Sequence, residues 1–498
     1  MKLKKTVAAL SIIFCLLLIS SLTGHKLTVK AQPTTWTVAN GNEPADFSKI
    51  QEAVNNANPG DIIFVHEGTY NESVEVNKSL SLIGEDRDLT IINGQEADFT
   101  ISITADNVTV KSFTINKAIS KLSDSGIRTI STGNTISHNK ITGIYIGIYL
   151  IYFGNNMVSD NIILSSNDTG ISLLFSTSNS FIGNTISNNQ NGISLSFSRN
   201  NWFIGNTISN NQNGISLSGI SSFNFFYHNN FQDAVVLESG LANTWSYDGE
   251  GNYWSNYAGQ DSDGDGIGED PYILDTRNQD SSPLMGMFSS FNVVLTRKTY
   301  SVTLISNSTV SDFRFEEGTE TGNKVLRFNV AGNDGTGGFS RIAIPIGLMN
   351  YSFVLIGEEE VRPAVLNISN KTHVYLYLTY SHANQTIMVV SSKTLNLYKE
   401  LDDKFSKLQT DLDNLSEIYY KLLTNYDALL GNYSQLQQGY LELNASYDDH
   451  LSDYRTNLEN VKSLIYIFAS ATAIFIITTI YFSRHLHTPS SKVLEDKK

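Results

Sequence analysis

The chain has 498 residues and a formal net charge of −15. This length predicts several domains, and the acidic balance argues against a nucleic-acid partner, because nucleic-acid binding requires a basic surface. The only cysteine, Cys15, lies in the first apolar run, so a processed chain has no disulfide, thiolate ligand or cysteine nucleophile.

Residues 1–31 have the pattern of a secretory signal peptide. The basic start "MKLKK" precedes an apolar run from Val7 to about Leu22, and "VKA" ending at Ala31 offers a small-residue cleavage site. An uncleaved signal anchor is the alternative, because the apolar run is long. Either reading predicts that the following residues are exported.

Twelve Asn-X-Ser/Thr sequons agree with export, since such sequons are glycosylation acceptors in exported segments. All of them lie between the first apolar run and a second one near the C-terminus, although an Asn-rich chain also produces some sequons by chance. The candidate glycosylation sites are Asn71, Asn77, Asn107, Asn167, Asn307, Asn350, Asn367, Asn370, Asn384, Asn414, Asn432 and Asn444.

Residues 32–237 are predicted to form a parallel β-helix with an N-terminal helical cap. In "FSKIQEAVNNANPGD" the apolar residues between Phe47 and Ala57 recur at helical spacing, which suits a short helix covering the first coil. Strand patterns follow in "IIFVHEGTY", "SVEVNKSLSLIG", "LTIING" and "VTVKSFTI". At about twenty-two residues per coil, this segment holds about eight coils.

The coils repeat most clearly where "FIGNTISNNQNGISLS" begins at Phe181 and again at Phe203. Apolar and polar residues alternate between Asn and Gly corners, and the period leaves no room for a helix. Equivalent residues should therefore stack in columns at about 4.8 Å, with Phe and Ile columns inside and an Asn column hydrogen-bonding along a corner. The expected columns are Phe181, Phe203 and Phe225; Phe175 and Phe197; and Asn134, Asn161, Asn184, Asn206 and Asn229.

Residues 238–290 are predicted to cap the last coil and to bind calcium in "DSDGDGIGED". Alternating carboxylates, a turn glycine and a backbone carbonyl follow the order of an EF-hand loop, and Ca²⁺ prefers such oxygen ligands. Position twelve is Tyr272 rather than an acid, so Glu269, Asp270 or Asp275 would have to substitute. The alternative is a solvated acidic turn. The candidate ligands are Asp261, Asp263, Asp265, Ile267, Glu269 and Asp270.

Residues 291–394 alternate as strands and predict a β-sandwich, with strand patterns in "YSVTLIS", "KVLRFNVAG", "RIAIPIG", "YSFVLIG", "HVYLYLTY" and "TIMVVS". Residues 395–463 carry leucines seven residues apart from Leu401 to Leu443, with aromatic residues between them, which predicts a coiled-coil stalk of roughly 90 Å and a homo-oligomer. A helix packed on its own β domain is the alternative.

Residues 464–482 carry no charge and are long enough to span a bilayer as a helix. Residues 483–498 form a basic tail that should face the cytoplasm. These features predict a single-pass protein of the cell membrane with most of the chain outside the cell.

Two kinds of side chain are candidates for carbohydrate chemistry. Aromatic residues stack on sugar rings, and "GIYIGIYLIYFG" presents Tyr145, Tyr149 and Tyr152, whereas those of "NTWSYDGEGNYWSNY" are expected to plug the last coil. Polysaccharide cleavage or epimerisation needs clustered acids or a base beside a cation, and the available residues do not stack in one column. Those residues are Asp124, Arg128, His138, Lys140, Asp160, Asp168 and Asp233.

The motifs "FSKIQEAVNNANPGDIIFVHEGTYNESVEVNKSLSLIGED", "GNTISNNQNGI" and "GNYWSNYAGQDSDGDGIGEDPYILD" resemble archaeal NosD-like β-helix surface proteins, related to the carbohydrate-binding and sugar-hydrolase β-helix group. The resemblance covers roughly residues 36–288 and implies a right-handed, pectin-lyase-like solenoid. It also implies copper delivery to nitrous oxide reductase for a periplasmic subset. Copper sites favour His, Met and Cys, but the histidines are scattered and Met285 and Met287 form a lone pair.

Taken together, the sequence favours a non-catalytic surface protein that binds glycans or cell-envelope components or has a structural role. A lyase, hydrolase or epimerase acting on polysaccharide is the alternative, and copper handling is a third.

Overall fold

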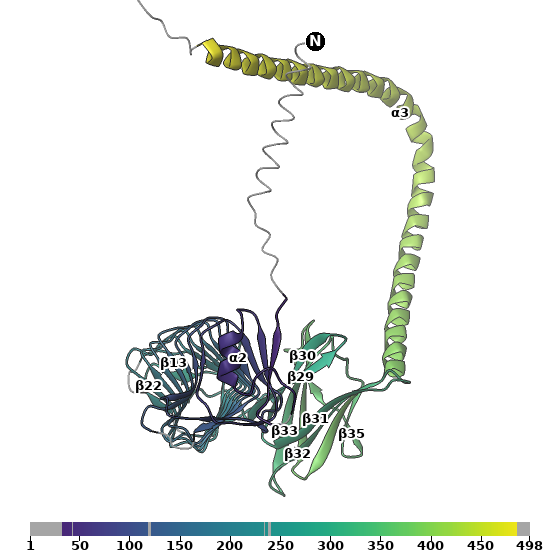
Figure 1. Cartoon of the computed structure of the whole chain (residues 1–498). Coiled ribbons are helices and arrows are strands. Elements are labelled where there is room, and N and C mark those ends of the chain that lie inside the picture. The colour runs from purple at the N-terminus through teal and green to yellow at the C-terminus, as the bar shows by residue number, and fades with distance from the viewer. Residues whose placement is uncertain (1–31, 42, 118–120, 234, 238–240, 486–498) are drawn as a thin grey trace, which may run out of the picture. The chain divides into compact units, whose positions relative to one another are not determined.

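The computed structural model describes residues 32–41, 43–117, 121–233, 235–237 and 241–485 (Figure 1). The predicted signal peptide and nearly all of the predicted cytoplasmic tail lie outside the described residues. The chain consists of two compact units, Met1–Asn396 and Leu397–Lys498. The first unit contains a parallel β-helix and a β-sandwich, and the second consists of one long helix.

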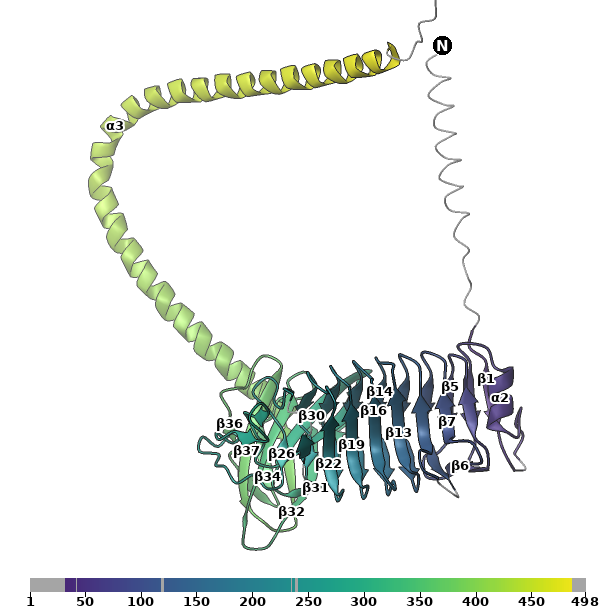
Figure 2. The ribbon, with the colours of Figure 1, turned by 90° about the vertical axis from the view of Figure 1, so that its left-hand side faces the viewer.

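Three parallel sheets, here called A, B and C, form the β-helix, and each coil contributes one strand to each sheet (Figure 2). Sheet A contains β1 (Thr35–Val38), β2 (Ile62–Val65), β5 (Ser81–Gly84), β8 (Thr109–Lys111), β11 (Thr135–Ser137), β14 (Met157–Ser159), β17 (Ser180–Ile182), β20 (Trp202–Ile204) and β23 (Phe225–Tyr227). Sheet B contains β3 (Gly68–Tyr70), β6 (Thr90–Gly94), β9 (Thr114–Lys117), β12 (Lys140–Thr142), β15 (Ile162–Leu164), β18 (Thr185–Ser187), β21 (Thr207–Ser209), β24 (Asn230–Phe231) and β26 (Tyr253–Trp254). Sheet C contains β4 (Val74–Val76), β7 (Phe99–Ile103), β10 (Ser125–Thr129), β13 (Ile146–Ile151), β16 (Thr169–Leu174), β19 (Asn191–Ser196), β22 (Asn213–Ser218) and β25 (Val235–Leu237).

The predicted helical cap is confirmed as α2 (Ile50–Asn56), which buries Ile50, Ala53 and Val54 against the first coil. Both oxygens of the Glu72 carboxylate accept from the N–H groups of Ile50 and Gln51 at 2.9 Å. These N–H groups have no hydrogen-bond acceptor within the helix, so the Glu72 carboxylate supplies the acceptors that the first turn lacks. The β-helix therefore begins with a closed end rather than an open sheet edge.

Inward-facing columns of Ile, Leu, Val and Phe fill the β-helix. Phe181 pairs in register with Phe203, and their rings stack with centroids 4.7 Å apart. The third member of this column is Phe226 and not Phe225, as the sequence suggested. A Cβ on Gly192 would lie 2.5 Å from the carbonyl oxygen of Gly214 in the next coil, and Gly126, Gly147 and Gly170 make the same close approach, which explains the glycine at this position of successive sheet C strands.

Asparagines form three ladders, one at each corner, rather than the single predicted column. In each ladder an Asn Oδ1 accepts from the backbone N–H of the equivalent residue one coil earlier. The predicted column mixes two of them, because Asn134 lies at the C–A corner and the other four lie at the A–B corner. The C–A ladder is Asn134, Asn156, Asn179, Asn201, Asn224, Asn243 and Asn278. The A–B ladder is Asn139, Asn161, Asn184, Asn206, Asn229 and Asn252, and Asn189 and Asn211 form the B–C ladder.

The β-helix extends beyond its predicted end at residue 237, because β26 (Tyr253–Trp254) still pairs in parallel with β24. A two-stranded antiparallel sheet of β27 (Tyr272–Ile273) and β28 (Gln279–Asp280) follows. The predicted aromatic plug is confirmed for Trp245 and Trp254, which are 1% and 3% exposed and stack on Phe226 and Phe231.

Two five-stranded antiparallel sheets form the sandwich around an apolar core. The first strand begins at Met287, earlier than predicted. One sheet contains β29 (Met287–Leu295), β30 (Lys298–Ser306), β33 (Gly337–Pro345), β37 (His373–Ser381) and β36 (Ala364–Val365). The other contains β31 (Thr309–Glu317), β32 (Lys324–Ala331), β38 (Gln385–Ser391), β34 (Phe353–Ile356) and β35 (Glu359–Val361).

The helix α3 begins at Lys393 and ends at His485, and its residues from Leu397 onward make up the described part of the second unit. Within it, Ser446–Tyr481 contains an apolar stretch that is long enough to cross a membrane. The heptad leucines that have described side chains are exposed, from Leu401 at 66% to Leu422 at 64%. The coiled coil remains a prediction.

Candidate functional surfaces

The outer face of sheet C presents an uncharged strip of hydroxyl and amide groups over four coils. Tyr149, Ser172, Ser194 and Ser216 pair in register and form one outward column. Beside it, Asn213 Nδ2 donates to Asn191 Oδ1 at 2.9 Å. We call the three serines of this column the serine strip. Such groups donate and accept hydrogen bonds with sugar hydroxyls.

The three predicted sugar-stacking tyrosines lie across one coil. Tyr145 immediately precedes β13, Tyr149 lies in its middle, and Tyr152 immediately follows it. Burial, with a smaller contribution from Tyr152, raises the pKa of Tyr149 above 10. Tyr152 is 66% exposed, but one face of its ring stacks on Phe175. Tyr149 at the end of the serine strip is therefore the best placed of the three.

The acidic and basic residues predicted for polysaccharide chemistry are spread over several sheets and corners. Asp124 forms a buried ion pair with Lys117 at 3.0 Å. The other contacts are Arg128 to Asp98 at 2.7 Å, Lys140 to Asp88 at 3.0 Å, Thr169 Oγ1 to Asp168 at 3.1 Å, and Asn211 N–H to Asp233 at 2.9 Å. Only His138 and Asp160, of the seven candidates, lie within ion-pair distance of each other, at 3.9 Å on the exposed A–B corner.

The predicted calcium loop brings three of its carboxylates together. One oxygen from each of Asp261, Asp263 and Asp265 lies within 4.8 Å of the others. Asp261 accepts N–H bonds from Gly264, Asp265 and Gly266 at 2.8–2.9 Å, and both glycines have positive φ. The loop therefore wraps around Asp261 with its carboxylates converging, as oxygen coordination of a cation requires.

The other predicted ligands are placed differently. Ile267 donates its N–H to Asp265 Oδ1 at 2.8 Å. Glu269 folds back on the loop and accepts from Ser262 N–H at 2.6 Å, whereas the backbone oxygen of Asp270 accepts from Tyr257. Burial raises the pKa of Asp265, and the negative charges of Asp263 and Asp261 raise it further. A bound cation would relieve this repulsion.

A partly buried ionic network connects the cap and the sandwich, and no sequence motif predicted it. Glu250 accepts from His228 Nε2 at 2.6 Å and from Arg341 Nη2 at 2.5 Å. Burial raises the pKa of Glu250, but the hydrogen bond from His228 and the charge of Arg341 outweigh it and hold the pKa at about 2. Tyr377 also donates to Asp261 across this boundary at 3.3 Å, so the calcium loop belongs to the same contact.

Asp280 ends the A–B ladder as its last acceptor. Its carboxylate accepts from Asn252 N–H at 2.7 Å and from the Trp254 indole at 2.9 Å. Burial outweighs these hydrogen bonds and raises the pKa of Asp280 to about 6. The cap that follows the last coil therefore contains a buried carboxyl group with a pKa of about 6.

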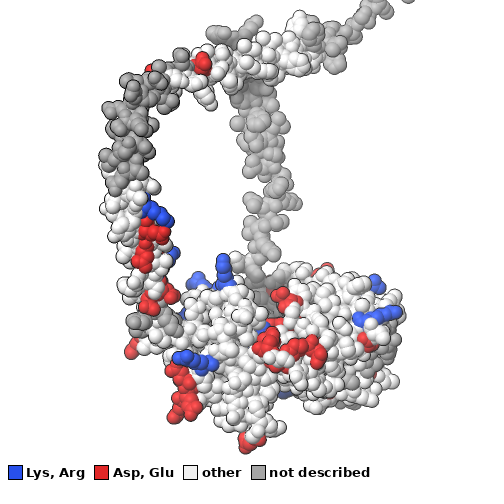
Figure 3. Space-filling model, turned by 180° about the vertical axis from the view of Figure 1, so that it is seen from behind, with Lys and Arg blue, Asp and Glu red and all other residues white. Residues whose placement is uncertain are grey.

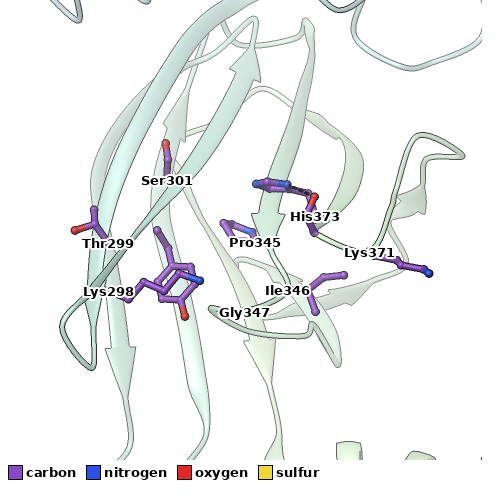
Figure 4. A pocket seen from close by; sticks show the side chains of 10 residues that line it. Lys298, Thr299, Ser301, Pro345, Ile346, Gly347, Lys371 and His373 are labelled. Carbon is purple, nitrogen blue, oxygen red and sulfur yellow. Dashed lines mark hydrogen bonds between the residues drawn. The ribbon is translucent and has the colours of Figure 1, made fainter. Parts of the chain in front are cut away.

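A shallow pocket of about 410 Å³ lies at the end of the first sandwich sheet (Figure 4). Its lining includes Lys298, Tyr300, Pro345 and His373, and the Lys298 ammonium lies 4.8 Å from the centre of the Tyr300 ring. Lys371 also borders the pocket, but its side chain points away from it in Figure 4. None of the predicted site residues lines this pocket.

Residues 54–259 match the family model described as periplasmic copper-binding protein NosD. This segment is a NosD-like parallel β-helix, which confirms the resemblance seen in the motifs. Among the described residues, the group that could hold a metal ion consists of the three loop aspartates and contains no His or Cys. That donor set suits a hard cation and not copper.

A cell surface glycoprotein of Methanothermus fervidus is 34% identical over 120 residues. The match covers 24% of this chain and 19% of that protein, so the chain matches about a fifth of its relative's length. Similar solved structures include pectin methylesterase PemA from Erwinia chrysanthemi, at 13% identity and a TM-score of 0.34, covering 46% of this chain and 92% of that one. Pectate lyase Pel9A has 15% identity and a TM-score of 0.33, covering 46% and 75%. Neither likeness carries an argument about activity.

Proposed function

We propose that this protein is anchored in the cell membrane by α3 and binds a glycan of the cell envelope on the outer face of sheet C without cleaving it. The matched relative is a cell surface glycoprotein, and Ser446–Tyr481 has the length and hydropathy of a membrane span. Every sequon asparagine with a described side chain is exposed, as glycosylation of an exported chain requires.

The serine strip carries the glycan proposal. Ser172, Ser194 and Ser216 repeat along the sheet at the strand spacing of about 4.8 Å. An extended polysaccharide also repeats its hydroxyl groups, so a regular row of donors and acceptors suits it. Tyr149 provides an apolar surface at one end of the row. A binding face of this kind needs no acid or base.

The dispersed acids and bases favour binding over catalysis. Cleavage of a glycosidic bond usually requires two carboxyl groups that flank it, and the exposed pair His138–Asp160 supplies only one. A polysaccharide-active enzyme is the second candidate, and the experiment below also tests it.

Calcium has a structural role in this proposal. Asp261, Asp263 and Asp265 would hold the ion, and the Glu269 carboxylate, which accepts from Ser262 N–H, lies beside the same loop. Because Tyr377 of the sandwich donates to Asp261, a bound ion would fasten the cap to the sandwich. Copper handling is not part of the proposal.

The stalk completes the proposal as a parallel homo-oligomer. The leucine positions from Leu401 to Leu422 are exposed on α3 and recur every seven residues, which is the pattern of a coiled-coil seam. Anchoring in one membrane would align the copies in parallel.

The test compares two substitutions in one coil of the full-length chain, purified in detergent with calcium. Ser194→Glu places a charge on the serine strip, whereas Ser180→Glu places the same charge on the outer face of sheet A. Both variants are screened on a glycan array and incubated with the glycans that bind. We expect Ser194→Glu to weaken binding at least tenfold and Ser180→Glu to leave it unchanged. Equal binding by both variants would refute the site, and product formation would establish the enzyme instead.

A further inference from the structure

A second surface of the β-helix is apolar and lies at the C–A corner, where each sheet C strand ends. Large apolar side chains project into solvent there from four successive coils. We call them the aromatic ridge: Tyr152, Phe153, Phe175, Phe197, Ile220 and Phe223, which are 66%, 47%, 45%, 40%, 50% and 62% exposed. The repeat spacing predicted Phe175 and Phe197 in the interior, but both side chains are exposed. An exposed apolar patch that spans several coils is typical of an interaction site.

The backbone of the ridge is in a conformation that bulky residues rarely adopt. Tyr152, Phe175 and Phe197 occupy equivalent positions with φ of 66°, 51° and 51°, in the left-handed region. The equivalent residue one coil later is Gly219, with φ of 63°, and glycine is the residue that suits this region. The chain therefore carries exposed aromatic residues where glycine would be less strained, and such strain is often found at functional sites.

The ring geometry favours a protein partner over a sugar. The rings of Tyr152 and Phe175 stack with centroids 5.7 Å apart, and those of Phe175 and Phe197 stack at 4.9 Å. The Phe197 ring in turn covers the backbone of Gly219, because a Cβ there would lie 3.0 Å from it. Sugar rings pack on exposed aromatic faces, but neighbours cover both faces of the Phe175 and Phe197 rings. The exposed parts of these two rings are therefore their edges, which suit apolar protein contacts.

Charge and the sequon positions favour a second copy of this chain as the partner, because a contact between two acidic copies needs a patch without charges or glycans. Two molecules with a net charge of −15 repel each other over most of their surfaces. Residues 141–232 carry only Asp160, Asp168 and Arg199 as charged side chains, and no sequon lies between residues 168 and 306. Figure 3 shows that uncharged side chains cover most of the β-helix in that view.

We propose that the aromatic ridge is a contact between two copies of this chain, in which each ridge packs on the other. A twofold contact of this kind uses the same patch on both copies. The proposal does not depend on glycan binding, because the serine strip lies on the face of sheet C and the ridge lies at its C–A corner.

Cysteine cross-linking of the full-length chain in detergent tests the contact. In a Cys15→Ser background, Ser178→Cys places an exposed thiol in the ridge loop, three residues after Phe175. Gln190→Cys places an exposed thiol at the B–C corner of the same coil, with the same stalk. A short bismaleimide should give at least five-fold more covalent dimer with Ser178→Cys than with Gln190→Cys.

Adding Phe175→Gly and Phe197→Gly should reduce the Ser178→Cys dimer to the Gln190→Cys level. Glycine suits the left-handed backbone, so tryptophan fluorescence should show that the variant remains folded. Equal dimer yields from the two thiols, or a yield that the glycine substitutions leave unchanged, would overturn the proposal. Loss of glycan binding in the Ser194→Glu variant with normal cross-linking would separate the two sites.

Discussion

Replacing Asn206 by alanine tests how much a corner ladder stabilises the β-helix. The side chain is fully buried, and its Oδ1 accepts from Asn184 N–H at 3.0 Å and from Asn184 Nδ2 at 2.9 Å. Its Nδ2 donates to the Phe181 carbonyl and to Asn229 Oδ1, both at 2.9 Å. The substitution removes all four hydrogen bonds and leaves buried partners unsatisfied. At about 1 kcal/mol per bond, we expect the unfolding free energy to fall by about 4 kcal/mol.

Tryptophan fluorescence during denaturant unfolding measures this loss, because all four tryptophans of the chain lie between residues 36 and 254. The matched control is Gln212→Ala, an exposed amide in the same coil, which should change the unfolding free energy by no more than about 0.5 kcal/mol. If Asn206→Ala unfolds at the same denaturant concentration as Gln212→Ala, the ladder contributes little and the reasoning is wrong.

Three further predictions concern the cap. Because the folded pKa of Asp280 is about 6 against an ordinary 3.8, stability should rise by up to about 3 kcal/mol as the pH falls from 7 to 4; Asp280→Asn should abolish this rise in fluorescence-monitored unfolding, and an unchanged slope would contradict it. The depressed pKa of Glu250 has the opposite effect, because wild-type stability falls as this carboxylate becomes protonated. Glu250→Gln should lower the unfolding free energy at pH 7 by about 3 kcal/mol, because Arg341 becomes an unpaired buried cation. The difference from wild type should shrink as the pH falls from 4.5 towards 2. Chelator should lower the melting temperature of wild type but not of Asp263→Ala, with Glu96→Ala responding like wild type; identical wild-type melting with and without chelator would rule out calcium.

The repeat made the coils predictable, but small variations in its length concealed some columns. The C–A corner loop has five residues from Phe197 to Asn201 and six from Gly219 to Asn224. A fixed spacing therefore selects Phe225, whereas the extra residue moves Phe226 into the core. Asn201 of the C–A ladder and Asn206 of the A–B ladder are five residues apart, and this spacing recurs in five successive coils. The recurrence would have revealed two ladders that flank sheet A.

Contacts between distant segments could not be predicted in this way. Glu250 and Arg341 are 91 residues apart, and neither belongs to a motif. The aromatic ridge was missed for a different reason: Phe175 and Phe197 have the spacing of core residues, and only the backbone φ shows that they leave the sheet. By contrast, the carboxylates that converge in the calcium loop are close in sequence, so their spacing alone predicted them.

Asparagine has two separate roles in this chain, and the coil geometry keeps them apart. In the A–B ladder, and in the C–A ladder from Asn134 to Asn224, each asparagine immediately precedes a short strand of sheet A or B, so the residue two positions later points into the core. That position is occupied by a buried apolar residue, which means that Asn-X-Ser/Thr cannot occur at these ladder positions without placing a hydroxyl in the core. Glycosylation during export is thereby confined to exposed asparagines, and the buried ladders remain unmodified and able to stack. The buried residues in question are Ile136, Val158, Phe181, Phe203 and Phe226 for the C–A ladder, and Ile141, Ile163, Ile186, Ile208, Phe231 and Trp254 for the A–B ladder.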